Sequence, residues 1–540
     1  MVAATTEQEQ EQREDHDPEV ADNGLPDSSV LTDKTPDWFK TTWHFPALVA
    51  ALGFVFTILS YYPLWHTDLW GHLAYGRVIV ELGGLPTTEP LLPLASGVPF
   101  ADTAWLSQLL GYEAYQWEGL AALHFLFASS IVACLAMIVT RLYGRTGSVA
   151  FSLLAMMVML LVGWKQLTIV RPQLAGLTCF VTLFMLLTAR RWTRVMWVGV
   201  PIIFTMWANL HGSFVVGLMM LAAFTIGRAG DIFLRTGQVG CVLANIRVRR
   251  TFLLTELAFV ATLVNPYGLG LYGEIWRISH HPNLQNLLDW DPLTIRMFQG
   301  QMATITALLL VFLYRASPRR VSLTEALLLV GFGLSALWNS RMIIWWTPLA
   351  AFLLAVHGHA VWSAWQRSRL RNNPPDEPLE QPEPAGKWSV VAIGLMWIFF
   401  SFTPFGTAIM HGRQPELSRS VSRQTPVAAA KYLNEHPPQG LVFNTYEWGD
   451  YLLFQGPPGI QLLIASHAHL IPKEVWNDYI NIIGMRSEWQ TLLDRYGANT
   501  IVIHKESNER MIKSLEQDAN WQRAYEDDLA SIFTRRKPIL

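Results

Sequence analysis

An aspartate and a histidine stand one helical turn apart just beyond the first apolar segment of the chain. Asp68 and His72 are four positions apart in residues 65–73, so a helix there would place both side chains on one face. The same helix would turn its apolar residues to the membrane surface, namely Leu69, Trp70 and Leu73. An acid at a bilayer boundary costs free energy unless it has a partner or a task. Asp68 is therefore the first candidate for a catalytic group, with His72 beside it.

Further polar side chains stand at the ends of other apolar segments or in the loop that follows Asp68. They are the acids Glu89 and Asp102, the cations Lys165, Arg171 and Arg341, and the neutral groups Asn209 and His211. Carboxylates, histidines and fixed cations on one face suit a phosphate-bearing, partly lipidic substrate, because Arg offers two parallel donors to phosphate. Two plainer interpretations stay open. Asn209 is also a good helix cap, and Arg341 has the reach to contact lipid headgroups.

A metal site is a weaker alternative at the same position. His66, Asp68 and His72 carry ligand-type side chains, but their spacing is looser than that of typical metal sites. The sequence therefore indicates no cofactor and leaves a divalent-metal requirement open. The three cysteines lie in or beside apolar stretches without paired or metal-type spacing, which is typical of small core residues.

Composition places these residues in a membrane protein. The chain has 540 residues, of which 51% are hydrophobic and only 15% charged, and this balance does not fit a soluble protein of that length. It excludes a soluble enzyme, a secreted disulfide scaffold and a nucleic-acid-binding protein as first interpretations. Residues 1–42 are acidic and have no apolar run, so they are predicted to be a disordered tail without a cleaved signal peptide.

The transmembrane region is predicted to occupy residues 43–411. Segments apolar and long enough to cross a bilayer, which takes about 20 residues, are 46–65, 119–140, 149–164, 172–189, 195–210, 214–233, 252–264, 303–314, 323–337, 342–361 and 388–410. About 11 crossings follow, with 10 to 12 as the safer range because several segments are short.

Basic residues orient these segments. Arginines crowd the even-numbered turns, as in 141–145, 228–250 and 315–320, whereas the odd-numbered turns carry few. Because Lys and Arg near span ends stay in the cytoplasm, the N-terminus is predicted inside and residues 412–540 outside. The first exterior loop is then about 66–118, and a Pro- and Glu-rich cytoplasmic linker is about 367–387. Glu81, Glu113 and Glu118 are read as ordinary solvated loop charges.

The last part of the chain alternates between strand and helix patterns. Strands are expected at 440–444, 460–465, 500–504 and 530–535, with helices between them, so 412–540 is predicted to be a small three-layer α/β domain. It has no glycine-rich phosphate loop and no nucleophile elbow, which argues against independent catalysis. His467 and His469 are expected to lie in a solvated loop, with contact to an acceptor as the less favoured alternative.

Several stretches together resemble a broad group of bacterial polytopic proteins related to the GT-C superfamily of membrane glycosyltransferases. The residues concerned are HTDLWGHLAYGRVIVELGGLPTTEP, WANLHGSFVVG, NPYGLGLY, NSRMIIWW and FNTYEWGDYLL, and the likeness runs from Trp43 to the C-terminus. Many GT-C enzymes carry two acids, adjacent or one residue apart, in the first loop; here Asp68 stands alone after Thr67. The resemblance implies a GT-C-like helical domain in the bacterial inner membrane, serving the cell envelope.

It also implies an activity, which is sugar transfer from a polyprenyl-phosphate donor to an acceptor hydroxyl on the exterior face. Asp68 would be the general base, and Arg341 with Lys165 or Arg171 would stabilise the departing phosphate. His72, Asn209 and His211 would position donor or acceptor. Two other classes remain open: a transporter or flippase for a lipid-linked or anionic solute, and a non-catalytic binding or assembly protein. Membrane lipids are expected partners, nucleic acid is not, and the oligomeric state is not indicated.

Overall fold

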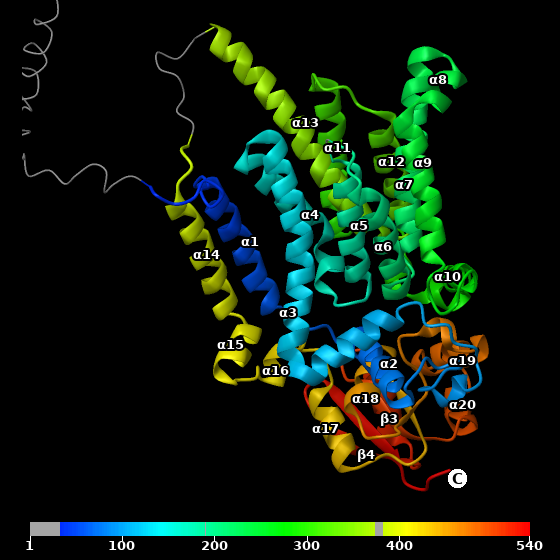
Figure 1. Ribbon diagram of the computed structural model, residues 1–540. Coiled ribbons are helices and arrows are strands. Elements are labelled where there is room, and N and C mark those ends of the chain that lie inside the picture. The colour runs from blue at the N-terminus through cyan, green and yellow to red at the C-terminus, as the bar shows by residue number, and fades with distance from the viewer. Residues whose placement is uncertain (1–32, 190, 373–381, 540) are drawn as a thin grey trace, which may run out of the picture.

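The computed structural model describes residues 33–189, 191–372 and 382–539, and it consists of a bundle of helices standing on a smaller part with a sheet (Figure 1). Most of the predicted tail, residues 1–32, and residues 373–381 of the predicted linker lie outside the described residues. The described part is mainly helical. It is an integral membrane protein by the apolar length of its helices.

Most of each predicted apolar segment lies in a helix or in a bent helix pair. These are α1 (His44–Ser60), α3 (Trp105–Thr146), α4 (Val149–Thr168), α5 (Gln173–Leu187), α6 (Val195–Leu210), α7 (Phe214–Thr236), α9 (Ile246–Thr262), α11 (Phe298–Ala316), α12 (Leu323–Trp338), α13 (Ile343–Asn372) and the pair α14 (Gly386–Ser401) and α15 (Pro404–His411). The shorter helices α8 (Val239–Ala244) and α10 (Gly270–Ser279) lie between them, and α16 (Leu417–Ser420) leads from α15 to the C-terminal part.

The number of membrane crossings stays a prediction. Among the described residues, four helices are long and apolar enough to cross by themselves, and α14 with α15 is a fifth only if this pair, bent by 84°, is one span. Helices such as α1 and α5 are apolar but short. The described helix ends that carry the arginine-rich turns, those of α3, α7, α11 and α13, lie together at the end of the bundle away from the sheet, hereafter the distal end (Figure 1).

The long helix α3 is two helices joined at a kink. Glu118 and Gly119 leave helical geometry, and Gly119 has a φ of +56°, which glycine adopts without the penalty of a Cβ. The apolar segment predicted from the sequence begins at this glycine. The part before the kink lies beside α2 (Leu69–Leu82) and the part after it runs through the bundle (Figure 1).

Helix α2 corrects one expectation. Leu69, Trp70 and Leu73 do not face a membrane surface; all three are buried in the same core as the C-terminal part of the chain. The Trp70 ring lies edge-on to that of Tyr451, with 4.9 Å between centroids. An amphipathic pattern shows that one helix face is buried but not what covers it. Here the apolar face of α2 is covered by residues of the C-terminal part.

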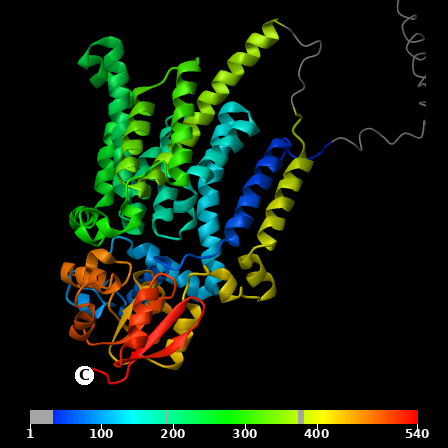
Figure 2. The same ribbon diagram turned by 180° about the vertical axis from the view of Figure 1, so that it is seen from behind.

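The C-terminal part contains a mixed five-stranded sheet, seen from the other side in Figure 2. Its strands are β1 (Leu441–Asn444), β2 (Gln461–Leu462), β3 (Ala498–His504), β4 (Trp521–Glu526) and β5 (Ala530–Arg535), in the order β2-β1-β3-β5-β4. The accompanying helices are α17 (Val427–Glu435), α18 (Gly449–Gln455), α19 (Lys473–Ile483), α20 (Trp489–Arg495) and α21 (Glu509–Gln517). Strand β4 was not predicted, because this edge strand is mostly polar and half exposed.

Candidate active site

Asp68 lies where the first loop turns into α2. It directly precedes the helix and has a φ of +52°, one of three non-glycine residues with positive φ in the described chain. Such a backbone costs on the order of 1–3 kcal/mol and persists only when the surroundings hold it. The side chain is about one-quarter exposed. The fold therefore fixes this carboxylate at the junction between the bundle and the C-terminal part.

A single arginine joins two carboxylates at this junction. Arg171, between α4 and α5, donates from Nε to Asp68 Oδ2 and from an Nη to Asp289 Oδ2, each over 2.6 Å. The Nζ of Lys165 lies 3.2 Å from the other oxygen of Asp289. Burial opposes ionisation of Asp68, but the charges of Arg171 and Arg341 hold its pKa below the usual value. Asp68 is therefore ionised at neutral pH.

Asp289 was missed as a site residue. It stands in a short 3-10 turn, Leu288–Trp290, after α10, and only its position in an outer loop marked it in the sequence. Burial opposes ionisation of this carboxyl too, and the charges of Arg171 and Arg341 keep its pKa low. Its backbone carbonyl accepts a hydrogen bond from Ser340 Oγ over 3.3 Å, which ties this turn to the residue before Arg341.

Arg341 and His211 lie at the edge of the same cluster. The Arg341 guanidinium carbon is 5.6 Å from the centre of the Trp290 ring, and the side chain makes no hydrogen bond or ion pair with any described residue. Burial and the charges of Arg341 and Arg171 lower the pKa of His211 to about 3, so the imidazole is neutral. Its Nδ1 accepts from the Ser213 backbone N–H over 3.1 Å.

The C-terminal part contributes two further side chains: Asp450, which was not predicted, and His467, for which a role at the site was only the less favoured alternative. Asp450, in α18, reaches α2 at Gly71, where an added Cβ would lie 2.7 Å from the carboxyl group. Its Oδ1 accepts from the Ser466 N–H over 2.9 Å, and burial together with the Asp68 charge raises its pKa to about 7. His467 is partly buried rather than solvated, with its ring centre 5.4 Å from that of His72. The solvated-loop expectation for His467 and His469 is wrong, because the loop packs onto α2.

His72 and Asp102 are joined through a glutamine. Gln108 donates from Nε2 to His72 Nδ1 over 3.2 Å and to Asp102 Oδ1 over 3.1 Å. Burial and the neighbouring His467 lower the pKa of His72 to about 3, whereas burial raises that of Asp102 to about 7. The second Asp102 oxygen has no hydrogen-bond partner among the described residues. This part of the site is buried and has little charge.

Two predicted residues have their polar groups occupied by the fold. Glu89 accepts from the Tyr75 hydroxyl over 2.8 Å and from the N–H groups of Leu91 and Leu92. Asn209 accepts from Trp105 Nε1 over 3.0 Å and donates to the carbonyls of Thr205 and Val264. Both side chains brace the walls of the site rather than present groups to it.

The weak metal alternative has no geometric support. His66 points to other partners, with Nδ1 3.3 Å from Ser422 Oγ and Nε2 3.7 Å from Glu447. Within the described ranges, no three His, Cys, Asp or Glu side chains lie close enough together to hold a metal ion.

An apolar groove of about 220 Å³ adjoins the charged cluster. It runs between α2, α3 and α5. Its walls are mostly apolar, with leucine the commonest residue, and His72, Gln108 and Arg171 are among the few polar residues that line it. The site thus combines a hydrocarbon-like groove with a cationic end, a combination that suits an amphiphile with an anionic head.

The fold is shared with solved membrane proteins, although no family model and no curated protein sequence matches the chain. The archaeal oligosaccharyltransferase AglB from Archaeoglobus fulgidus, in complex with an inhibitory peptide and a dolichol-phosphate, aligns with 86% of this chain and 69% of its own at 11% identity and a TM-score of 0.54. ArnT from Cupriavidus metallidurans bound to undecaprenyl phosphate aligns over 91% and 97% at 12% identity and a TM-score of 0.50. Both are GT-C membrane glycosyltransferases. The resemblance seen in the sequence is confirmed at the level of the fold, which the chain shares with these two proteins.

Proposed function

We propose that this protein is a membrane glycosyltransferase that moves a sugar from a polyprenyl-phosphate donor to an acceptor hydroxyl. The observation that carries the proposal is the cluster of Asp68, Arg171 and Asp289 at the mouth of an apolar groove. The GT-C fold supports the general kind of reaction, since AglB and ArnT were solved with dolichol-phosphate and undecaprenyl phosphate.

The donor would enter with its isoprenoid chain in the groove and its phosphate at the cations. Arg171 lines the groove, and the Arg341 guanidinium makes no hydrogen bond or ion pair with an acid among the described residues. Both offer parallel N–H donors to phosphate oxygens. As the bond between the anomeric carbon and the phosphate oxygen breaks, negative charge grows on the departing phosphate, and fixed cations stabilise it without reorganising.

Asp68 would take the proton of the acceptor hydroxyl while that oxygen attacks the anomeric carbon. Arg171 occupies one carboxylate oxygen in the structure and makes Asp68 a weak base. A donor phosphate competes with Asp68 for the Arg171 guanidinium, so donor binding would raise the basicity of Asp68 at the moment when a base is needed. His72 and His211, both neutral, would orient donor or acceptor through hydrogen bonds.

The decisive experiment is a transfer assay on the purified protein in lipid with labelled polyprenyl-phosphate sugars. Asp68→Asn should fold normally and lose transfer by ~10²-fold or more, because an amide cannot accept the proton. Glu113→Gln, an exposed acid on α3, is the matched control and should keep full activity. Retention of more than about a tenth of the rate in Asp68→Asn would exclude it as the base.

We also propose that the N-terminus and the distal end face the cytoplasm, with the site and residues 412–540 outside in the cell envelope. Support comes from the arginine-rich helix ends, which lie together at the distal end (Figure 1). A periplasmic reporter on the C-terminus of the full chain should be active, and one inserted within 372–385 should be silent. The reverse pattern would overturn the orientation while leaving the transfer assay unaffected.

A further inference from the structure

The distal end holds a second polar cavity that the transfer reaction does not use. It has a volume of about 390 Å³ and lies between the ends of α3, α7 and α12 and a face of α13. Four arginines line it, Arg145, Arg228, Arg235 and Arg319, against two acids, Asp231 and Glu325. The formal charge of the lining is therefore 4 − 2 = +2.

The two acids already have partners. Asp231 Oδ1 accepts from the N–H of Leu323 over 3.2 Å. Glu325 contacts Arg319 over 3.5 Å and His357 Nε2 over 3.2 Å. By contrast, no hydrogen bond or ion pair connects Arg228 or Arg235 to another residue in the described ranges. Arg228 is partly buried and Arg235 is exposed at the rim. A partly buried guanidinium without an acceptor favours binding of an external anion.

Close packing of α7 against the start of α12 fixes this geometry. Gly227 permits it, because a Cβ there would lie 2.5 Å from the backbone of Thr324. Arg228, Asp231 and Arg235 are three and four positions apart and so share one face of α7. The start of α12, the positive end of that helix, lies on the same cavity, with Ser322 and Thr324 in its lining. The cations are therefore presented by rigid helices rather than by loops.

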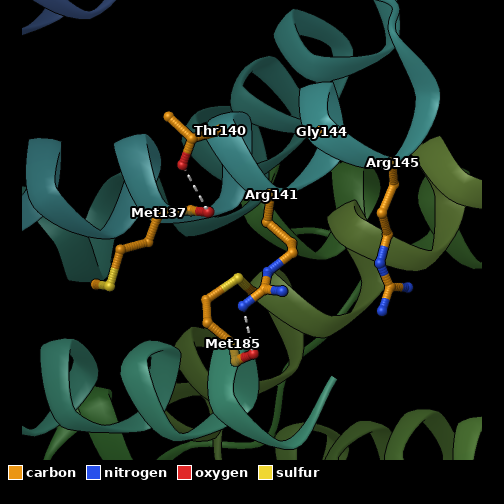
Figure 3. A pocket seen from close by; sticks show the side chains of 6 residues that line it. All are labelled: Met137, Thr140, Arg141, Gly144, Arg145 and Met185. Atoms are coloured by element: carbon orange, nitrogen blue, oxygen red, sulfur yellow. Dashed lines mark hydrogen bonds between the residues drawn. The ribbon is translucent and has the colours of Figure 1, made fainter. Parts of the chain in front are cut away.

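In a neighbouring pocket, by contrast, the arginines are hydrogen-bonded to backbone carbonyls. It measures about 470 Å³, and Figure 3 shows Arg141 and Arg145 pointing from α3 toward α5. Arg141 donates to the Met185 carbonyl over 2.8 Å, and Arg145 donates to that of Thr188. Both stabilise the carboxyl end of α5, where backbone carbonyls lack helical partners. This pocket is explained by helix capping, whereas the cavity at Arg228 is not.

We propose that the cavity between α7 and α12 binds the phosphate of an anionic lipid headgroup, with Arg228 and Arg235 as its ligands. Its other wall is apolar and includes Phe224, Leu328 and Phe352, which suits the first carbons of the attached chain. Basic pockets between transmembrane helices commonly hold such headgroups. The site is independent of the transfer reaction, because it lies at the opposite end of the bundle.

Native mass spectrometry of the detergent-purified full chain tests this, with phosphatidylglycerol, phosphatidylcholine or inorganic phosphate added. Wild type should retain phosphatidylglycerol preferentially. The double variant Arg228→Gln/Arg235→Gln should bind it roughly tenfold or more weakly, since each lost charge-assisted hydrogen bond has about that effect. Arg249→Gln/Arg315→Gln removes two exposed charges of the same sign elsewhere and should bind as wild type does.

Three results would overturn the proposal. Equal weakening in both double variants would indicate diffuse attraction to basic helix ends, and no weakening in either would place the lipid elsewhere. Saturation by inorganic phosphate with displacement of the lipid would identify a small-anion site. If Arg228→Gln/Arg235→Gln does not fold, Arg228→Lys replaces it; this variant keeps the charge but loses the paired donors, and it should still weaken lipid binding.

Discussion

Replacing Arg171 by glutamine would leave Asp68 and Asp289 facing each other without the cation that joins them. Both hydrogen bonds to Arg171 measure 2.6 Å, and the two carboxylates are only about one-quarter exposed. Removing one member of a buried ion pair costs roughly 3–5 kcal/mol, chiefly through the uncompensated charge left behind. Because both acids keep some contact with water, we expect a loss near the lower bound, about 3 kcal/mol.

The pH dependence of this loss of stability tests the role of Arg171 more specifically than its size does. Arg171 is the largest influence that lowers the Asp68 pKa, and burial raises it. Without the arginine, burial and mutual repulsion should lift both carboxyl pKa values above those of the unfolded chain. Acidification would then protonate the acids and relieve the repulsion. The difference in Tm between wild type and Arg171→Gln should therefore be largest above pH 7 and shrink toward pH 5.

Thermal unfolding in detergent, followed by intrinsic fluorescence from pH 5 to 8, measures both effects. Lys165→Gln is the matched control, since its side chain is about half exposed and its ammonium forms an ion pair only with Asp289 among the described residues. It should cost less than about 1 kcal/mol. A difference in Tm that does not change with pH, or a loss no larger than that of Lys165→Gln, would refute the assigned role of Arg171.

Three further predictions concern single side chains around the site. Arg341→Lys keeps the charge but loses the paired donors, so donor KM or turnover should worsen roughly tenfold or more; unchanged kinetics would assign Arg341 to lipid contact. Asp450→Asn should raise Tm at pH 8 and have less effect toward pH 4. Burial lifts the Asp450 pKa to about 7, so the ionised acid destabilises the folded protein progressively as pH rises from about 4 to 7. A difference in Tm that is the same at every pH would contradict this. Gly71→Ala places a methyl group against the Asp450 carboxyl and should lower Tm and transfer together, whereas Gly84→Ala, with open space around it, should leave both near wild type.

The helices were largely predictable, but the full site was not. Apolar runs such as 119–140 are recognisable in the sequence because a bilayer requires about 20 apolar residues for each crossing. Asp68, Arg171 and Arg341 stood out because charges at span ends are costly and therefore informative. Asp450 gave no such signal and His467 only a weak one, because a polar residue outside the apolar segments is ordinary until the fold brings it beside α2. Asp289 was marked in the sequence only as an acid in an outer loop, which was not enough to identify it as a site residue.

Helix α2 has a consequence for how the protein is made. Its buried partners, among them Tyr451, are synthesised long after Leu69, Trp70 and Leu73, since ribosomes build the chain from the N-terminus. During that interval the apolar face of α2 has no protein to cover it, and the nearest apolar surface is the bilayer itself. We expect the nascent helix to rest on the lipid, as its pattern alone indicates, and to leave it when the last domain folds. The proposed transfer activity would then arise only when the final part of the chain has folded, so truncated products would be inserted in the membrane but inactive.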